Sequence, residues 1–100
     1  MGSFTVRIRK RALGDIDRIR SWYRNIDSSL EDRFVRALNE ALDRVQEFPF
    51  IYQVAYRNTH KISLKKFPYA VFYLIQESRI IVLAVIHHKR NPALAQGAAE

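Results

Sequence analysis

Apolar and polar side chains alternate over residues 4–9, at the start of the chain. A period of two residues is typical of a strand with one buried and one solvated face. The buried face would consist of Phe4, Val6 and Ile8. The opposite face would be basic, because it carries Arg7 and Arg9.

The period then changes to three and four residues, which is typical of an amphipathic helix. This pattern predicts a helix over residues 11–25. Its apolar stripe is formed by Ala12, Ile16, Ile19, Tyr23 and Ile26, with Leu13 and Trp22 beside it. Charged residues, Asp15 among them, are expected to lie off the stripe.

A second helix is predicted over residues 29–47, where the helical spacing of apolar residues continues. Its stripe consists of Leu30, Phe34, Leu38, Ala41, Val45 and Phe48. Ser28 and Glu31 have the spacing of a capping box, and Pro49 ends the helix because proline has no backbone N–H. Since few residues separate the two helices, we expect an antiparallel helical hairpin.

Three strands are predicted after this hairpin, over residues 60–65, 68–76 and 79–87. The last two are almost entirely apolar, so we expect both of their faces to be buried. Short polar breaks between them favour hairpin connections. Residues 49–58 have no clear period but contain five large apolar or aromatic side chains, so we expect this loop to pack on the core.

These elements predict an α+β fold with two layers. An N-terminal strand would be followed by the antiparallel helical hairpin and then by a three-stranded antiparallel meander. The hairpin would cover one face of the sheet and leave the other face open. We expect one domain over residues 1–100, with a core at about 4–92 and a weakly ordered tail at 93–100.

Composition narrows the class of protein. One hundred residues with 48% hydrophobic side chains are enough for one packed domain and exclude a disordered chain. The absence of cysteine excludes disulfide frameworks, thiolate metal sites and cysteine nucleophiles. A net charge of +7 favours a polyanionic partner, which could be nucleic acid, an acidic protein segment or an anionic surface.

The sequence predicts neither a membrane-spanning helix nor a signal peptide. No apolar run approaches the ~20 residues that a spanning helix requires. Residues 1–4 also lack the apolar segment of a signal peptide. We therefore expect a soluble, cytoplasmic protein.

The first candidate site directly follows the last predicted strand and consists of His87, His88, Lys89 and Arg90. Histidine can act as a general acid or base near neutral pH, and arginine can bind a phosphate or carboxylate with two parallel hydrogen bonds. The structural alternative, favoured for this segment alone, is that His87 packs at the strand end and the cations form a solvated cap.

A second candidate surface combines cations with aromatic side chains: Lys61, Lys65 and Lys66 near Tyr69 and Tyr73. RNA-binding surfaces use this combination, because aromatic rings stack on bases and cations bind phosphates. The alternative is that the tyrosines are core residues and the lysines protect a sheet edge. The three histidines lack a carboxylate at ligand spacing, so we expect neither a metal site nor a cofactor.

The combination of three motifs resembles the ParE/RelE toxin superfamily. The motifs are the FPY-x-x-x-Y segment at 67–73, the apolar strand that ends in His87, and the Arg-x-Pro segment at 90–92. The helical hairpin with Arg33-Phe34 and its Phe48-Pro49 exit agree as well, so the resemblance covers about residues 4–92. It implies the toxin of a type II toxin–antitoxin, or plasmid stabilisation, module.

The resemblance also implies a partner and two alternative targets. A cognate antitoxin, with an acidic segment that folds on binding, would neutralise the toxin in a hetero-oligomer. The ParE branch is associated with inhibition of DNA gyrase without hydrolytic chemistry, whereas RelE-like members cut messenger RNA on the ribosome. An inactive relative that serves as a binding module is a third possibility.

Position by position, the residues favour the ParE branch. Lys61 and Arg90 match cations of the RelE pattern, but Ser63 and Ala70 stand where that pattern has a lysine and an arginine. The terminal tyrosine of RelE also has no counterpart, because residues 91–100 contain no aromatic side chain. A ribonuclease reading would need Arg90, His87 and Lys61 as catalytic groups. The candidate binding residues, whichever target is correct, are Lys65, Lys66, Tyr73, His88 and Lys89.

Overall fold

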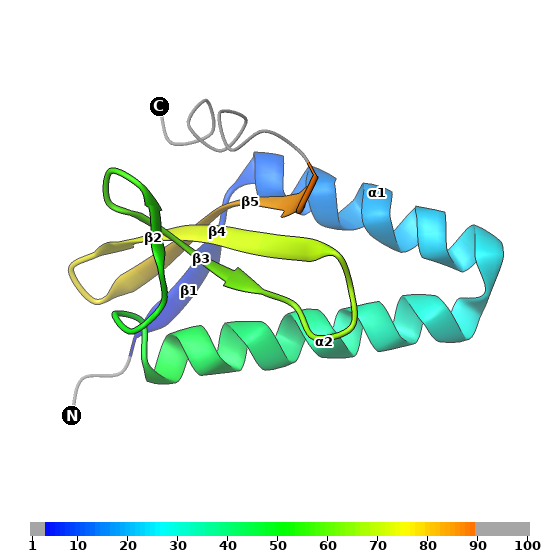
Figure 1. Ribbon diagram of the computed structural model, residues 1–100, viewed down its shortest axis with the longest axis horizontal. Coiled ribbons are helices and arrows are strands. Elements are labelled where there is room, and N and C mark those ends of the chain that lie inside the picture. The colour runs from blue at the N-terminus through cyan, green and yellow to red at the C-terminus, as the bar shows by residue number, and fades with distance from the viewer. Residues whose placement is uncertain (1–3, 90–100) are drawn as a thin grey trace.

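The computed structural model describes residues 4–89 of the chain. Figure 1 shows the elements in the order β1 (Thr5–Ile8), α1 (Lys10–Ile26), α2 (Ser28–Glu47), β2 (Val54–Tyr56), β3 (Thr59–Ser63), β4 (Tyr69–Gln76) and β5 (Arg79–His87). The predicted α+β fold is confirmed. Arg90 and the tail predicted at 93–100 lie outside the described residues.

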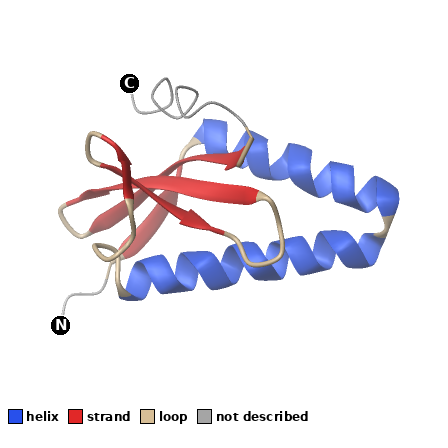
Figure 2. Cartoon of the chain, in the orientation of Figure 1, coloured by secondary structure: helices blue, strands red, loops and turns tan. Residues whose placement is uncertain are grey.

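The strands form one sheet in the order β1-β5-β4-β3-β2. β1 runs parallel to β5, and all other neighbours are antiparallel. The two helices between β1 and β2 lie side by side and antiparallel (Figure 2). β5 is therefore an interior strand, as its apolar sequence predicts, and the meander has one strand more than the sequence pattern indicated.

Side chains from the helices and from one face of the sheet form the main core. Phe34 and Val45 of α2 and Val71, Tyr73 and Ile80 of the sheet are all completely buried in it. The other sheet face carries a second, smaller cluster of buried residues, which are Ala70, Phe72, Ala84 and Ile86. Both faces of β4 and β5 are thus buried, as expected.

The helical hairpin turns at a single residue, Asp27. Its side chain accepts a hydrogen bond from the Ser29 N–H at 2.8 Å and so caps α2. The predicted capping box is wrong, because Glu31 turns to α1 and binds Arg20 and Arg24 there. One ion-paired carboxylate therefore holds the two helices together near the turn.

Several side chains expected in the core lie at the surface. Trp22 and Ile26, near the C-terminal end of α1, are exposed. Figure 1 shows that this end of the helical hairpin extends beyond the sheet. The loop after α2 packs on the core only in part: Tyr52 contacts it, but the exposed apolar side chains are Phe48, Phe50, Ile51 and Val54. Conversely, Asp15 is only 6% exposed, although we expected it off the apolar stripe.

Candidate functional site

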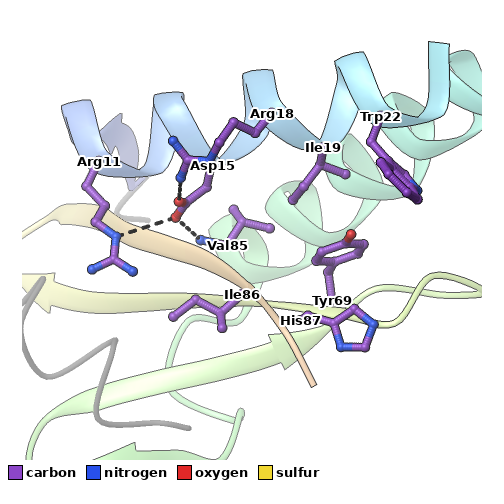
Figure 3. Close-up of a pocket in the computed structure, with 9 residues that line it drawn as sticks. All are labelled: Arg11, Asp15, Arg18, Ile19, Trp22, Tyr69, Val85, Ile86 and His87. Carbon is purple, nitrogen blue, oxygen red and sulfur yellow. Dashed lines mark hydrogen bonds and ion pairs between the residues drawn. The ribbon is translucent and has the colours of Figure 1, made fainter. Parts of the chain in front are cut away.

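A pocket of ≈ 390 Å³ lies between α1 and the last residues of β5. Figure 3 shows the side chains that line it: Arg11, Asp15, Arg18, Ile19, Trp22, Tyr69, Val85, Ile86 and His87. His87 belongs to the first candidate site of the sequence. The other eight residues were not predicted to surround it.

The pocket exists because β1 is shorter than β5. β1 pairs with β5 only as far as Ile8 and Val82, and the chain then leaves the sheet as Arg9 donates its N–H to the Val82 carbonyl at 3.0 Å. The next part of β5 therefore has no strand on its β1 side, whereas β4 still pairs with its other side. α1 crosses there instead and supplies the wall of the pocket.

Asp15 satisfies the backbone of this open edge. Its Oδ2 accepts a hydrogen bond from the Val85 N–H at 2.9 Å, and its Oδ1 accepts one from the Arg18 guanidinium. Arg11 adds its charge at 3.8 Å from Oδ2. A buried carboxylate needs such partners, so Asp15 is a structural anchor for the pocket wall.

His87 is half-buried at the other end of the pocket. Its ring meets Tyr69 edge to face, with the centroids 5.2 Å apart. Nδ1 accepts a hydrogen bond from the Lys89 N–H at 3.1 Å, so the ring proton of this tautomer resides on Nε2. His87 can thus donate a hydrogen bond to a ligand from Nε2, beside the aromatic side chains of Tyr69 and Trp22.

Lys61, the second catalytic candidate, lies on the opposite face of the sheet from His87. Its cross-strand partner is Phe72, and Ser63 pairs with Ala70 in the same way. Side chains alternate along a strand, and Ile62 and Val71 belong to the helix-facing core. Lys61 and Ser63 therefore share the outer face with the apolar cluster of Ala70 and Phe72.

Tyr73 is removed from the candidate binding residues by its burial. The side chain is completely buried, and its hydroxyl donates a hydrogen bond to the Pro49 carbonyl at 2.8 Å. The ring stacks on His60, whose Nδ1 lies 2.9 Å from the Tyr52 carbonyl. Burial, together with the nearby Tyr52, raises the pKa of Tyr73 far above its ordinary value. The residue holds the loop after α2 to the sheet, which is the core alternative of the sequence reading.

The remaining candidates are divided among separate surfaces. Lys65 and Lys66 lie in the turn between β3 and β4 and line a different groove, beside α2. His88 and Lys89 are exposed in the turn after β5. Within residues 4–89, no three His, Cys, Asp or Glu side chains form a group that could hold a metal ion. Neither α1 nor α2 is long and apolar enough to span a membrane.

Of the two pocket residues Asp15 and Trp22, which were not predicted to lie near His87, only Asp15 has a signal in the sequence. Asp15 lies three residues after Ala12 and four before Ile19, which are both buried, so helical spacing alone places it on the stripe. Trp22 carries no comparable signal. Its place at the pocket depends on where α1 crosses β5.

Comparison with known proteins assigns the family. The model of the ParE toxin of the type II toxin–antitoxin system parDE matches residues 6–92. The chain belongs to this family. No curated protein sequence gives a significant match.

Solved structures share the fold. A chain of the chromosomal ParDE system from P. aeruginosa superposes with a TM-score of 0.74 at 13% identity, over 85% of this chain and 96% of that one. A mutant of E. coli RelE in the free state, in which two arginines are replaced by alanine, gives a TM-score of 0.65 at 20% identity. The match covers 99% of this chain and 95% of that one. For the isolated E. coli RelE toxin the TM-score is 0.60 at 19% identity, with 97% of each chain covered.

Membership of the ParE family gives the chain a class and a partner. It is the toxin type of a type II toxin–antitoxin system, and such a toxin has a cognate antitoxin.

Proposed function

We propose that this ParE-family toxin inhibits DNA gyrase, or a similarly essential target, by binding and does not cut RNA. One observation carries the choice of binding over catalysis: the candidate catalytic groups of the described chain do not converge. Lys61 lies on the outer sheet face, whereas His87 lies in the pocket on the helix side. Cleavage of RNA needs a base, an acid and a cation around one phosphate.

The surroundings of Lys61 support the same choice. Its neighbours on the outer face are Ser63, Ala70 and Phe72, which carry no charge to stabilise a phosphorane. Ala70 and Phe72 are also buried, at 2% and 6% exposure. Among these cross-strand neighbours in the described part of the chain, Lys61 is therefore the one cation that a phosphate could contact.

RelE-like cleavage of ribosome-bound messenger RNA is the second candidate function. It is favoured by the fold shared with RelE and by Lys61 and Arg90, which match cations of that pattern. In that case Arg90 would stabilise charge in the transition state, and Arg90→Ala would abolish cleavage but leave ribosome binding. An inactive relative that only binds a partner is the third candidate.

The test compares two activities of the purified chain. We expect the wild type to inhibit supercoiling by gyrase and to leave ribosome-bound messenger RNA intact. Lys61→Ala and His87→Ala are the controls for catalysis. Under this proposal both variants should leave ribosome-bound messenger RNA intact, as the wild type does. Codon-positioned cuts by the wild type that disappear in Lys61→Ala or Arg90→Ala would overturn the proposal. Expression without growth arrest would favour the inactive relative.

A further inference from the structure

An irregularity in β5 determines which side chains of this strand meet α1. In the pairing of β4 with β5, Leu83 has no cross-strand partner of its own. It lies between Val82 and Ala84, which pair with consecutive residues of β4. Leu83 is therefore the extra residue of a β-bulge, and such a residue redirects the side chains that follow it.

The bulge turns His87 toward α1. Before it, Val82 belongs to the core on the helix side of the sheet. After it, Val85 belongs to that core, whereas Ala84 belongs to the cluster on the outer face. Because side chains alternate along a strand, His87 lies on the helix side together with Val85. The pocket between α1 and β5 thus receives a histidine that an unbroken alternation would have placed on the outer face.

Hydrogen-bond donors predominate among the polar groups of this pocket. Both carboxylate oxygens of Asp15 are occupied, one by the Val85 N–H and the other by the Arg18 guanidinium. Arg18 spends one of its several N–H groups in this way, and its side chain is 72% exposed. Within the described residues, the indole N–H of Trp22 and Nε2 of His87 have no acceptor. Such a set of donors is suited to an anion.

The charges of the lining residues favour an anion as well. Arg11 and Arg18 are cationic, and Asp15 is the one acidic residue among the side chains that line the pocket. The arginines therefore exceed the carboxylate by one positive charge. A ligand with a single carboxylate matches this excess, and a cationic ligand is repelled.

Aromatic side chains form the other end of the pocket. Figure 3 shows the ring of Trp22 above those of Tyr69 and His87, with Arg11 toward the opposite end. Trp22 is 64% exposed and makes no ring contact or hydrogen bond with any other described residue. The fold does not use this large ring, so its face is available to a planar ligand.

We propose that this pocket binds a small aromatic carboxylate. The ring of the ligand lies against Trp22, and its carboxylate accepts hydrogen bonds from Arg18. The pocket volume of ≈ 390 Å³ lies within the range of ~300–1,000 Å³ that is usual for small-molecule sites. This binding activity goes beyond the proposed function and does not depend on it.

A nucleotide fits the pocket less well than an aromatic carboxylate. A terminal phosphate carries more negative charge than the single positive excess of the lining residues. The amino groups of a base need acceptors, and the carboxylate of Asp15 is already occupied. An aromatic carboxylate has neither requirement.

Trp22 provides the measurement, because it is the single tryptophan of the chain. Its fluorescence therefore reports on this pocket alone. The probe is phenylacetate, which should change the tryptophan emission with a saturable dependence on concentration. Phenylacetamide has the same ring without the charge, and cyclohexylacetate has the carboxylate without the aromatic ring. Each should bind at least about fivefold more weakly than phenylacetate.

The contribution of Arg18 is tested by Arg18→Gln, which removes the charge but keeps an amide N–H for Asp15. Arg36→Gln is the matched control. Arg36 is exposed on α2 and lines the separate groove beside that helix. Phenylacetate should bind Arg18→Gln at least about fivefold more weakly than wild type and should bind Arg36→Gln within about twofold of wild type.

The contribution of the indole ring is tested by Trp22→Ala, with Ile26→Ala as the control. Both side chains are exposed near the C-terminal end of α1, so neither truncation should unfold the protein. A ligand that binds the folded state raises the melting temperature. Phenylacetate should raise it equally in wild type and Ile26→Ala and much less in Trp22→Ala. This comparison remains decisive if Arg18→Gln is unstable.

Four results would overturn the assignment of a charged aromatic ligand. The first is the absence of any change in emission or melting temperature with phenylacetate. The second is equal binding of phenylacetate and phenylacetamide. The third is equal weakening by Arg18→Gln and Arg36→Gln, which would indicate an effect of net charge alone. The fourth is an unchanged rise in melting temperature in Trp22→Ala.

Two further ligands test the class of molecule. Adenosine monophosphate should bind more weakly than phenylacetate, and tighter binding that is lost in Trp22→Ala would assign the pocket to nucleotides. A tripeptide that ends in phenylalanine should not bind more tightly than phenylacetate, and the opposite result would assign the pocket to the end of a protein chain. None of these measurements requires gyrase, ribosomes or growth arrest, so the proposed function can fail without affecting them.

Discussion

The carboxylate of Asp15 in α1 accepts a hydrogen bond from the backbone N–H of Val85 in β5, although the two residues lie 70 positions apart in the sequence. β1 has already ended at this level of the sheet, so α1 provides the acceptor that a neighbouring strand would have provided. The bond fixes the crossing of α1 over β5 and, with it, the wall of the His87 pocket.

Asp15→Leu should therefore destabilise the fold. The buried Val85 N–H would lose its acceptor, which costs about 1–3 kcal/mol in the free energy of unfolding. Asp15→Asn should cost less, because its amide oxygen can still accept that bond. Urea unfolding at neutral pH measures both values. Asp17→Asn, on the exposed side of α1, is the control and should change stability by less than about 0.5 kcal/mol. Equal stability of Asp15→Leu and wild type would contradict the anchoring role.

Glu31 should make the stability of the hairpin depend on acid pH. Hydrogen bonds from Arg24, assisted by Arg20 and opposed by burial, lower the pKa of Glu31 from 4.5 to about 2. A lowered pKa in the folded state stabilises the protein above pH 4.5, and this contribution disappears as the pH falls from 4.5 toward 2.

Glu31→Gln should accordingly be less stable than wild type at neutral pH, and the difference should shrink between pH 4.5 and pH 2. Thermal unfolding over this range measures the effect. Asp32→Asn changes the neighbouring carboxylate, which is exposed, and serves as the control. A stability difference between Glu31→Gln and wild type that stays constant down to pH 2 would show that the Arg24 pair contributes no linkage.

Tyr73→Phe should separate structure from function at a residue that the sequence placed among the binding candidates. The variant removes the hydroxyl that binds the buried Pro49 carbonyl at 2.8 Å. We expect a loss of about 1–3 kcal/mol in unfolding free energy. Activity per folded molecule should not change. Tyr56→Phe is the control because its ring contacts the guanidinium of Arg57 at the surface. Loss of activity by a folded Tyr73→Phe would restore Tyr73 as a functional residue.

Local patterns predicted the elements that have strong periodicity. The alternation at residues 4–9, the two helical stripes and the apolar runs before Gln76 and His87 all correspond to observed elements. The short strand β2 was missed because three residues, Val54–Tyr56, give no pattern of their own and depend on pairing with β3. The loop before β2 was expected to pack on the core, but Phe50 and Ile51 in this loop are exposed.

The candidate sites depended on contacts that no local pattern contains. The sequence placed His87 at a strand end correctly, but its neighbours Arg11, Arg18 and Trp22 come from a helix whose crossing angle the sequence does not specify. The sequence alone does not show whether Lys61 and His87 lie on the same face of the sheet. The pairing of β3, β4 and β5 places them on opposite faces. The groove beside α2 likewise requires knowing which helix the turn at Lys65 and Lys66 contacts.

The outer sheet face allows a last prediction, which bears on catalysis as well as stability. Ser63 and Ala70 are cross-strand partners and stand where the RelE resemblance would have a lysine and an arginine. Ser63 is exposed, whereas Ala70 is 2% exposed and lies in the cluster with Phe72, Ala84 and Ile86. Ser63→Lys should therefore be tolerated, and Ala70→Arg should cost about 2 kcal/mol or more, because the guanidinium must displace packed apolar side chains.

Urea unfolding of the two single variants tests whether Ala70→Arg costs more stability than Ser63→Lys. The double variant tests whether these two cations are sufficient for RNA cleavage. Ser63→Lys with Ala70→Arg returns both cations of the RelE pattern to the surroundings of Lys61, but His87 stays on the opposite face. We expect the double variant to be destabilised and still unable to cleave ribosome-bound RNA. A stable double variant that cuts RNA would mean that two substitutions suffice to complete a catalytic face, and it would count against the gyrase proposal. The apolar packing of Ala70 and Phe72 argues for the first outcome, since a surface already buried in the folded toxin is not one that a phosphate can reach.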